Sequence, residues 1–236
     1  MKVLNIVIVV VFFLFVTIES SALIARYAGW KIGSVSLGYS FHNAILSLNR
    51  FLGFLIGPLI GFRVDTGAAP RELLELTACG LLFAAVGTSL VYLYWGMISE
   101  SFCQVLQKIK TDGYKLHSFS AISFEKGRGI SPLKGRLIPS FFYSSAITTG
   151  LFVSVSFVLN LIAIYHFNYR GSILQLTGAV SGIGSLLLNF YTNPHLAVAE
   201  EAGYANDGYH SVFAGKIFGV AVISPLLVLI VWGVFR

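Results

Sequence analysis

Charged side chains are scarce in this chain of 236 residues, since Asp, Glu, Lys and Arg together make up only 11% of it. A soluble domain carries about 25% of such residues. Hydrophobic residues account for 56% of the sequence, and apolar stretches of about 18 residues or more recur along nearly all of it. The composition therefore predicts an integral membrane protein and leaves no room for a soluble domain of ordinary size.

The sequence also has few cysteines and lacks several common catalytic and metal-binding patterns. The two cysteines, Cys79 and Cys103, would lie about 36 Å apart if the third predicted helix continued through both, which is too far for a disulfide bond. The five histidines have no metal-ligand spacing, and the CxxC, HExxH, GxSxG and Walker patterns do not occur. We expect no metal, no cofactor, no catalytic residue and no nucleic-acid partner.

The hydropathy pattern predicts an all-α, polytopic helical bundle that forms a single transmembrane domain over residues 1–236. The six predicted spans cover residues 3–24, 34–62, 73–98, 139–167, 173–191 and 212–235. We expect the first span to be retained rather than cleaved as a signal peptide, because its apolar run is long and only Lys2 precedes it. The second span would be about 43 Å long as a helix, so it is either a tilted, kinked helix or a re-entrant hairpin.

Lys and Arg are concentrated in the first, third and fifth loops, with Lys216 counted among them. The positive-inside rule then places the basic loop 99–138 in the cytoplasm and both termini outside. Within this loop, residues 101–111 have the spacing of a short amphipathic helix. The loop also carries a basic doublet, which either attracts anionic membrane lipids or collects a phosphorylated lipid headgroup. The doublet consists of Lys126, Arg128, Lys134 and Arg136.

Arg50 lies near the middle of the second predicted span, about ten residues or more from either end. A charge at that depth in a bilayer costs at least about 2.5 kcal/mol, so it needs a partner, a water-filled cavity or an anionic ligand. Intramembrane charges commonly mark transport paths. Arg50 is therefore the strongest single indication of what the protein binds or moves.

Two polar faces on consecutive helices point to a common site. Glu19 and Arg26 are seven residues apart, so they share one helix face about 10 Å apart, and Asn43 and Arg50 repeat this spacing. We predict a Glu19–Arg50 pair that lines a cavity, with a purely structural ion pair between two helices as the alternative. The candidate binding residues are Glu19, Arg26, His42, Asn43, Asn49 and Arg50.

Small residues form ridges on several spans. Gly53, Gly57 and Gly61 are spaced four apart, and the pairs Gly178–Gly182 and Gly215–Gly219 repeat this spacing, which in membranes is typical of close helix–helix contacts. Pro58 removes a backbone hydrogen bond within the first ridge and predicts a kink there. Asp65 follows at the end of the span, so Pro58, Gly61 and Asp65 are candidate gate or anchor residues.

The polar residues of the first two spans form a pattern that resembles a known family. The pattern is Glu19-x6-Arg26-Tyr-Ala-Gly29 followed by Asn43-x6-Arg50-x7-Pro58-x2-Gly61-x3-Asp65. It resembles the Amj-type alternate lipid II flippases of bacteria, over residues 19–65. The resemblance implies a multi-pass protein of the bacterial cytoplasmic (inner) membrane that moves lipid II, the undecaprenyl-pyrophosphate-linked peptidoglycan precursor, from the cytoplasmic to the outer leaflet.

In such a flippase Arg50 and Arg26 would bind the pyrophosphate by charge-assisted hydrogen bonds. Glu19 would hold Arg50 when no substrate is present. The headgroup is bulky, so it either slides along a polar groove open to lipid or sits in a cavity shared by a homodimer. The alternatives are a transporter of another polyprenyl-phosphate-linked sugar or anion, an intramembrane enzyme acting on prenyl phosphates through Glu19 and His42, and a scaffold subunit.

Overall fold

The computed structural model describes residues 2–113 and 130–235, and within these residues it contains helices and no strand. The elements in chain order are α1 (Lys2–Lys31), α2 (Val35–Asp65), α3 (Pro70–Leu93), α4 (Trp95–Asp112), α5 (Pro139–Tyr165), the 3₁₀ turn η2 (Phe167–Tyr169), α6 (Arg170–Leu187), the π-helical segment η3 (Leu188–Thr192), α7 (Asn193–Glu201), α8 (Ala205–Phe218), the π-helical segment η4 (Gly219–Ile223) and α9 (Ser224–Phe235). The prediction of an all-α bundle is confirmed.

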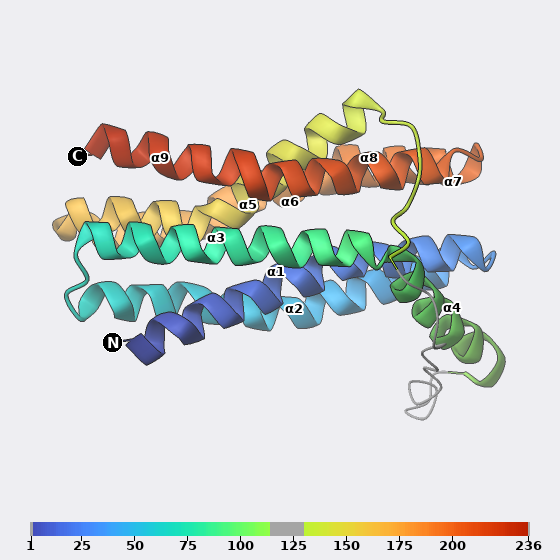
Figure 1. Ribbon diagram of the computed structural model, residues 1–236, viewed down its shortest axis with the longest axis horizontal. Helices are drawn as coiled ribbons and strands as arrows, with labels where there is room; N and C mark the ends of the chain where they lie inside the picture. Colours follow the sequence, from blue (N-terminus) through green and yellow to red (C-terminus); the bar gives the residue numbers. More distant parts are fainter. Residues whose placement is uncertain (1, 114–129, 236) are drawn as a thin grey trace.

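Six helices or continuous helical runs are long and apolar enough to cross a membrane in the part of the chain that the structure describes. They are α1, α2, α3, α5, the run from α6 through η3 to α7, and the run from α8 through η4 to α9. Figure 1 shows these helices side by side along the long axis of the molecule. The chain is therefore a multi-pass helical membrane protein, as its composition predicts.

The second span is one uninterrupted helix, so the hairpin alternative for residues 34–62 is wrong. Pro58 lies inside α2 and has no N–H to donate to the carbonyl four residues earlier. The helix nevertheless continues to Asp65, where Thr66 and Gly67 close its last turn through backbone hydrogen bonds to Phe62 and Val64.

The third span is shorter than predicted, because it ends at Leu93 and α4 leaves the bundle in a different direction (Figure 1). The backbone of Ser131 occupies the break. Its N–H donates to the carbonyl of Leu93, and its carbonyl accepts from the N–H of Gly96. The predicted amphipathic helix 101–111 is the second half of α4, whose buried Val105, Leu106 and Ile109 pack on the ends of α1 and α2.

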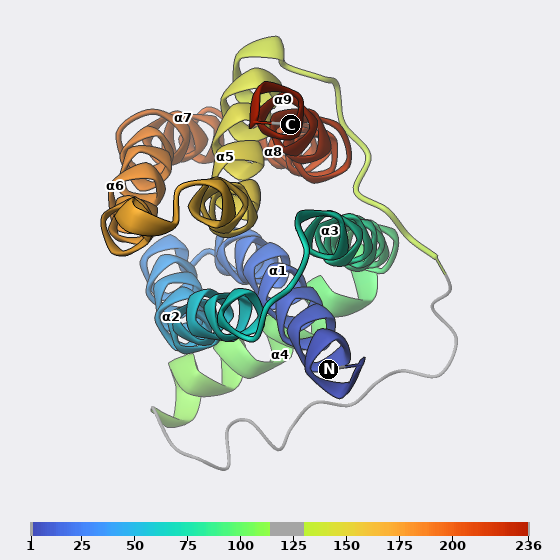
Figure 2. The same ribbon diagram turned by 90° about the vertical axis from the view of Figure 1, so that its left-hand side faces the viewer.

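Both chain termini lie at one end of the bundle, together with the turns after α2 and α5 (Figure 1). The opposite end holds α4 and the turns after α1 and α7. Seen end-on in Figure 2, α1 and α5 occupy the middle, and α2 and α6 lie on the same flank. The Phe12 and Phe157 rings of α1 and α5 meet edge-to-face, with 4.9 Å between their centroids.

Glycines allow α1 and α2, and likewise α8 and α5, to approach each other closely. A Cβ at Gly29 of α1 would lie 2.3 Å from the Cα of Gly38 in α2, so only glycine at both positions permits this approach. Gly215 and Gly219 likewise pack on the backbone of α5. The predicted Gly215–Gly219 contact is therefore confirmed, in line with the use of small residues where membrane helices associate.

Candidate functional site

A cavity of about 1510 Å³ lies between α2 and α6, with α1 and α5 behind it. On α2 its lining extends from Tyr39 to Asp65, which corresponds to about 39 Å of helix at 1.5 Å per residue. On α6 it extends from Arg170 onward, and Asn189 and Asn193 continue the wall beyond that helix. The cavity therefore follows the membrane-spanning helices over most of their length.

Two glycine rows, on α2 and α6, line this cavity, and most of their members pack against no other helix. A Cβ at any of five lining glycines would meet nothing within 4 Å, whereas one at Gly53 would meet the Phe15 ring of α1 and one at Gly184 would meet Thr148 and Phe152 of α5. The expectation that these two ridges form helix–helix contacts holds for Gly53, which packs on Phe15 of α1, and is wrong for Gly57, Gly61, Gly178 and Gly182, which widen the cavity. The five glycines with open space are Gly57, Gly61, Gly171, Gly178 and Gly182.

Arg50 lines the cavity and is exposed. It is the central residue of α2, with 15 residues on either side (50 − 35 and 65 − 50). Among the residues that the structure describes, its guanidinium has neither a hydrogen bond nor an ion pair. The predicted Glu19–Arg50 pair is therefore wrong, but the expectation that Arg50 faces a cavity is confirmed.

Glu19 pairs with Lys216 of α8 instead, with 2.9 Å between Oε1 and Nζ. Both side chains line the cavity, and they are 16% and 9% exposed respectively. The second carboxylate oxygen of Glu19 is buried without a hydrogen-bond partner among the described residues. Lys216 lies within the α8 helix and not in a loop, so its assignment to the fifth loop is wrong. Helical spacing could not reveal this pair, because its members are 197 residues apart.

Arg26 is buried behind the cavity wall and is not part of the lining. Its Nε donates to Glu200 Oε1 at 2.8 Å, and its Nη1 donates to Asn193 Oδ1 at 3.1 Å. Tyr209 donates its hydroxyl to the same Glu200 carboxylate, and the guanidinium carbon lies 5.3 Å from the centre of the Tyr39 ring. With its donors occupied in this way, Arg26 ties α1 to α7, and it is not available to bind an anion.

The remaining predicted binding residues of α2 divide into an exposed one and two buried ones. Asn43 is exposed on the cavity wall. His42 is buried and uses Nδ1 to contact the carbonyl of Ala22 at 2.8 Å. Asn49 donates Nδ2 to the carbonyl of Phe15 at 2.9 Å, which leaves its buried Oδ1 without a partner in the described part of the chain.

Asn160 of α5 repeats the arrangement of Asn49 and was not predicted. Its Nδ2 donates to the carbonyl of Ser156 at 2.8 Å, and its Oδ1 is buried without a partner among the described residues. A carbonyl only accepts, so the amide nitrogen must face it in each case. A lone asparagine in an apolar span carries no sequence signal that distinguishes it from a packed polar residue.

At the end of the cavity nearest both termini, Asp65 pairs with Arg170, the first residue of α6. Arg170 also donates Nη2 to the carbonyl of Gly61 at 2.8 Å. Two of the predicted gate or anchor residues, Gly61 and Asp65, thus join α2 to α6, while Pro58 lines the cavity wall. The neighbouring Arg63 anchors the end of α2 through Glu72 at 2.6 Å and through Asn5.

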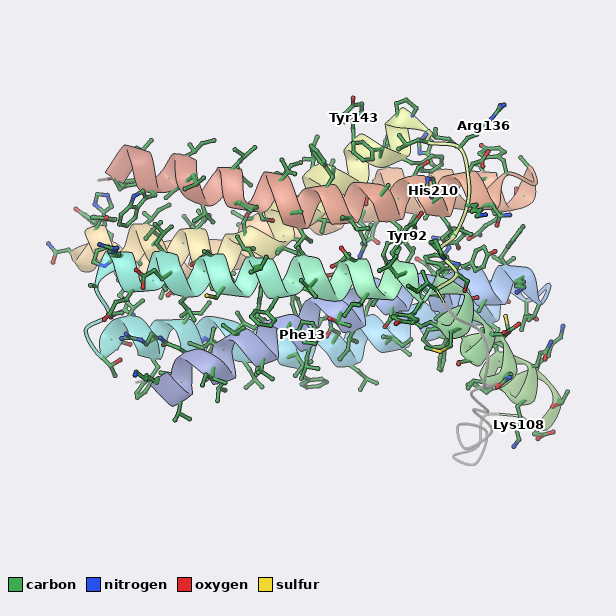
Figure 3. The ribbon with its side chains drawn as sticks, viewed as in Figure 1. Phe13, Tyr92, Lys108, Arg136, Tyr143 and His210 are labelled. Carbon is green, nitrogen blue, oxygen red and sulfur yellow. The ribbon has the colours of Figure 1, made fainter. Side chains whose placement is uncertain are left out.

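The basic surface is described only in part, because Lys126 and Arg128 lie outside residues 2–113 and 130–235. Lys134 and Arg136 are exposed, and the backbone N–H of Arg136 donates to Asp207 Oδ1 at 2.8 Å. Figure 3 shows Arg136 and Lys108 pointing away from the bundle at the end opposite both termini. Tyr92 fixes this segment through a hydrogen bond to the carbonyl of Leu133 at 2.8 Å.

Within the described residues, no group of three or more His, Cys, Asp or Glu side chains could hold a metal ion. The fold and the cavity thus define a multi-pass helical membrane protein with a charged cavity along one flank of its bundle. Comparison of the chain with models of protein families, with curated proteins and with solved structures finds no match.

Proposed function

We propose that the protein is a lipid flippase whose cavity carries the headgroup of a polyprenyl-phosphate-linked lipid across the membrane, with lipid II as the substrate. One observation supports this more than any other. Arg50 faces the cavity at mid-helix depth without a partner among the described residues. An uncompensated charge at this depth is costly unless a ligand or water meets it.

The cavity suits a lipid because it is both charged and apolar. Phe54 and Phe62 of α2 line it and are 72% and 60% exposed. A hydrocarbon chain can therefore remain in the bilayer beside these rings while its headgroup occupies the space behind them. The glycine rows present no side chains that would obstruct the headgroup.

The charges of the cavity favour a phosphate. Apart from the Asp65–Arg170 pair at its end, the described lining carries two cations, Arg50 and Lys216, and one carboxylate, that of Glu19. A guanidinium binds phosphate oxygens with two parallel N–H donors, which makes it a specific ligand for such a group. An intramembrane enzyme is less favoured, because His42 is buried and already bound to the Ala22 carbonyl.

The size of the cavity is consistent with a large headgroup. Sites for drug-sized molecules occupy about 300–1,000 Å³, and this cavity occupies about 1510 Å³. The choice of lipid II also relies on the resemblance over residues 19–65. We propose that the end with α4 and the exposed Lys134 and Arg136 faces the cytoplasm of a bacterium, because positive charge marks that side. A homodimer remains a prediction, which the mass of the purified protein in nanodiscs would test.

Complementation tests the proposal. The chain is expressed in bacteria depleted of their essential lipid II flippase, beside Arg50→Ala and a control, Arg71→Ala. Arg71 is exposed, pairs with Glu75 of its own helix and with no other residue that the structure describes, and does not line the cavity. We expect rescue by the wild type and by Arg71→Ala and loss of rescue by Arg50→Ala at equal protein levels. Full rescue by Arg50→Ala would overturn the proposal. No rescue by a well-inserted wild type would reject lipid II as the substrate.

A further inference from the structure

Two ion pairs bind α1 to the second half of the chain, and their surroundings differ. Arg26 and Glu200 are 3% and 2% exposed, and both carboxylate oxygens of Glu200 accept hydrogen bonds from Arg26. This pair is internally complete. Its burial and its position outside the cavity lining leave it no contact with a ligand.

The Glu19–Lys216 pair is incomplete by the same measure. One hydrogen bond of 2.9 Å joins it, and the second oxygen of Glu19 has no partner among the described residues. An ammonium group has three N–H donors, and that of Lys216 has one acceptor in the described part of the chain. Both side chains line the cavity that Arg50 also lines.

We infer that Lys216 is a second anion ligand of the cavity and that Glu19 is its internal competitor, so that a phosphate entering the cavity displaces the Glu19 carboxylate from Lys216. This inference rests on the proposed function and extends it by naming a group outside α2, on α8, that recognises the phosphate. Glu19 neutralises Lys216 in the empty cavity. The phosphate then replaces one anion at Lys216 with another.

A competitor and a ligand respond oppositely to mutation. Removing the charge of Glu19 leaves Lys216 without a counter-ion, so the affinity for a phosphate should rise. Removing the charge of Lys216 deletes a ligand, so the affinity should fall. If the ion pair only holds two helices together, both changes should shift the affinity in the same direction. Either change leaves the partner charge unpaired in a low-dielectric site.

The test is binding by the full-length protein in phosphatidylcholine nanodiscs. The probes are geranylgeranyl pyrophosphate and inorganic pyrophosphate, which separate a lipid headgroup from a free phosphate. We expect Glu19→Gln to bind geranylgeranyl pyrophosphate about fivefold more tightly than the wild type and Lys216→Gln about fivefold more weakly. Arg71→Gln is the matched control and should bind like the wild type. Inorganic pyrophosphate should follow the same order with lower affinity.

Equal affinities of Glu19→Gln, Lys216→Gln and the wild type, together with weaker binding by Arg50→Gln, would overturn the inference and leave the proposed function standing. No binding by the wild type or by Glu19→Gln would overturn both. The exchanged variant Glu19→Lys/Lys216→Glu guards against misfolding, since it keeps the ion pair and the net charge. Its unfolding midpoint should match that of the wild type. The unfolding midpoints of Glu19→Gln and Lys216→Gln show whether a change in affinity comes from a change in stability.

Discussion

Asp65, the last residue of α2, pairs with Arg170, the first residue of α6, and this contact joins the two helices that flank the cavity. Farther along, glycines on both helices face open space. Apart from Gly184, the described side chains of α6 are exposed or only partly buried. The two helices are therefore held together at one end of the cavity, by the ion pair and by the Gly61 carbonyl.

We predict that Arg170→Gln opens this end of the cavity, because it removes the charge that holds Asp65. The measurement is the rate at which a membrane-impermeant maleimide labels Gly57→Cys, in a background with Cys79 and Cys103 changed to alanine. We expect the rate to rise about tenfold, which corresponds to about 1.4 kcal/mol of closing free energy. An unchanged rate would mean that the pair does not keep the cavity closed.

A second prediction concerns the glycine rows. Leucine at Gly57 or Gly178 fits the open space and fills the cavity, so we expect flipping to fall about tenfold without loss of folded protein. Gly233→Leu is the matched control, because it also meets nothing within 4 Å and does not line the cavity. Lipid transfer in reconstituted vesicles is the readout. A Gly57→Leu protein as active as Gly233→Leu would exclude this part of the cavity from the transport path.

Glycine has the opposite role where α1 crosses α2. A Cβ at Gly38 would lie 2.6 Å from the Cα of Gly29, so Gly38→Ala must separate the helices. We predict a loss of about 1–3 kcal/mol in the free energy of unfolding, measured by denaturant titration in detergent. Gly233→Ala should change it by less than about 1 kcal/mol. Equal values for the two variants would show that the crossing is not tightly packed.

The buried Arg26–Glu200 pair provides a fourth prediction. Glu200→Gln leaves the Arg26 guanidinium buried without a counter-charge, and such a change costs about 3–5 kcal/mol of stability. The exposed Arg71–Glu75 pair is the control, and breaking it should cost at most about 1 kcal/mol. Denaturant titration of both variants measures the difference. A loss for Glu200→Gln no larger than that of the control would contradict the structural role assigned to Arg26.

The helices were predictable because long apolar runs and their charged flanks determine where membrane spans lie. Cavity-facing Arg50 was predictable for the same reason, since its charge interrupts such a run. Its expected partner was wrong because helical periodicity places residues on faces but does not say which helices are neighbours. Lys216 and Glu200, the actual partners of Glu19 and Arg26, come from spans far along the chain. The glycine spacing in α2 and α6 is the same for a helix face that packs against another helix as for one that lines a cavity.

The most direct test of the account is transfer of lipid II between leaflets in vesicles that contain the purified protein, for the wild type, Arg50→Gln and the control Arg71→Gln. We predict transfer by the wild type and by Arg71→Gln, with a rate at least about tenfold lower for Arg50→Gln. Equal transfer by all three proteins would contradict it, because the charge in the middle of the cavity would then have no part in moving the lipid.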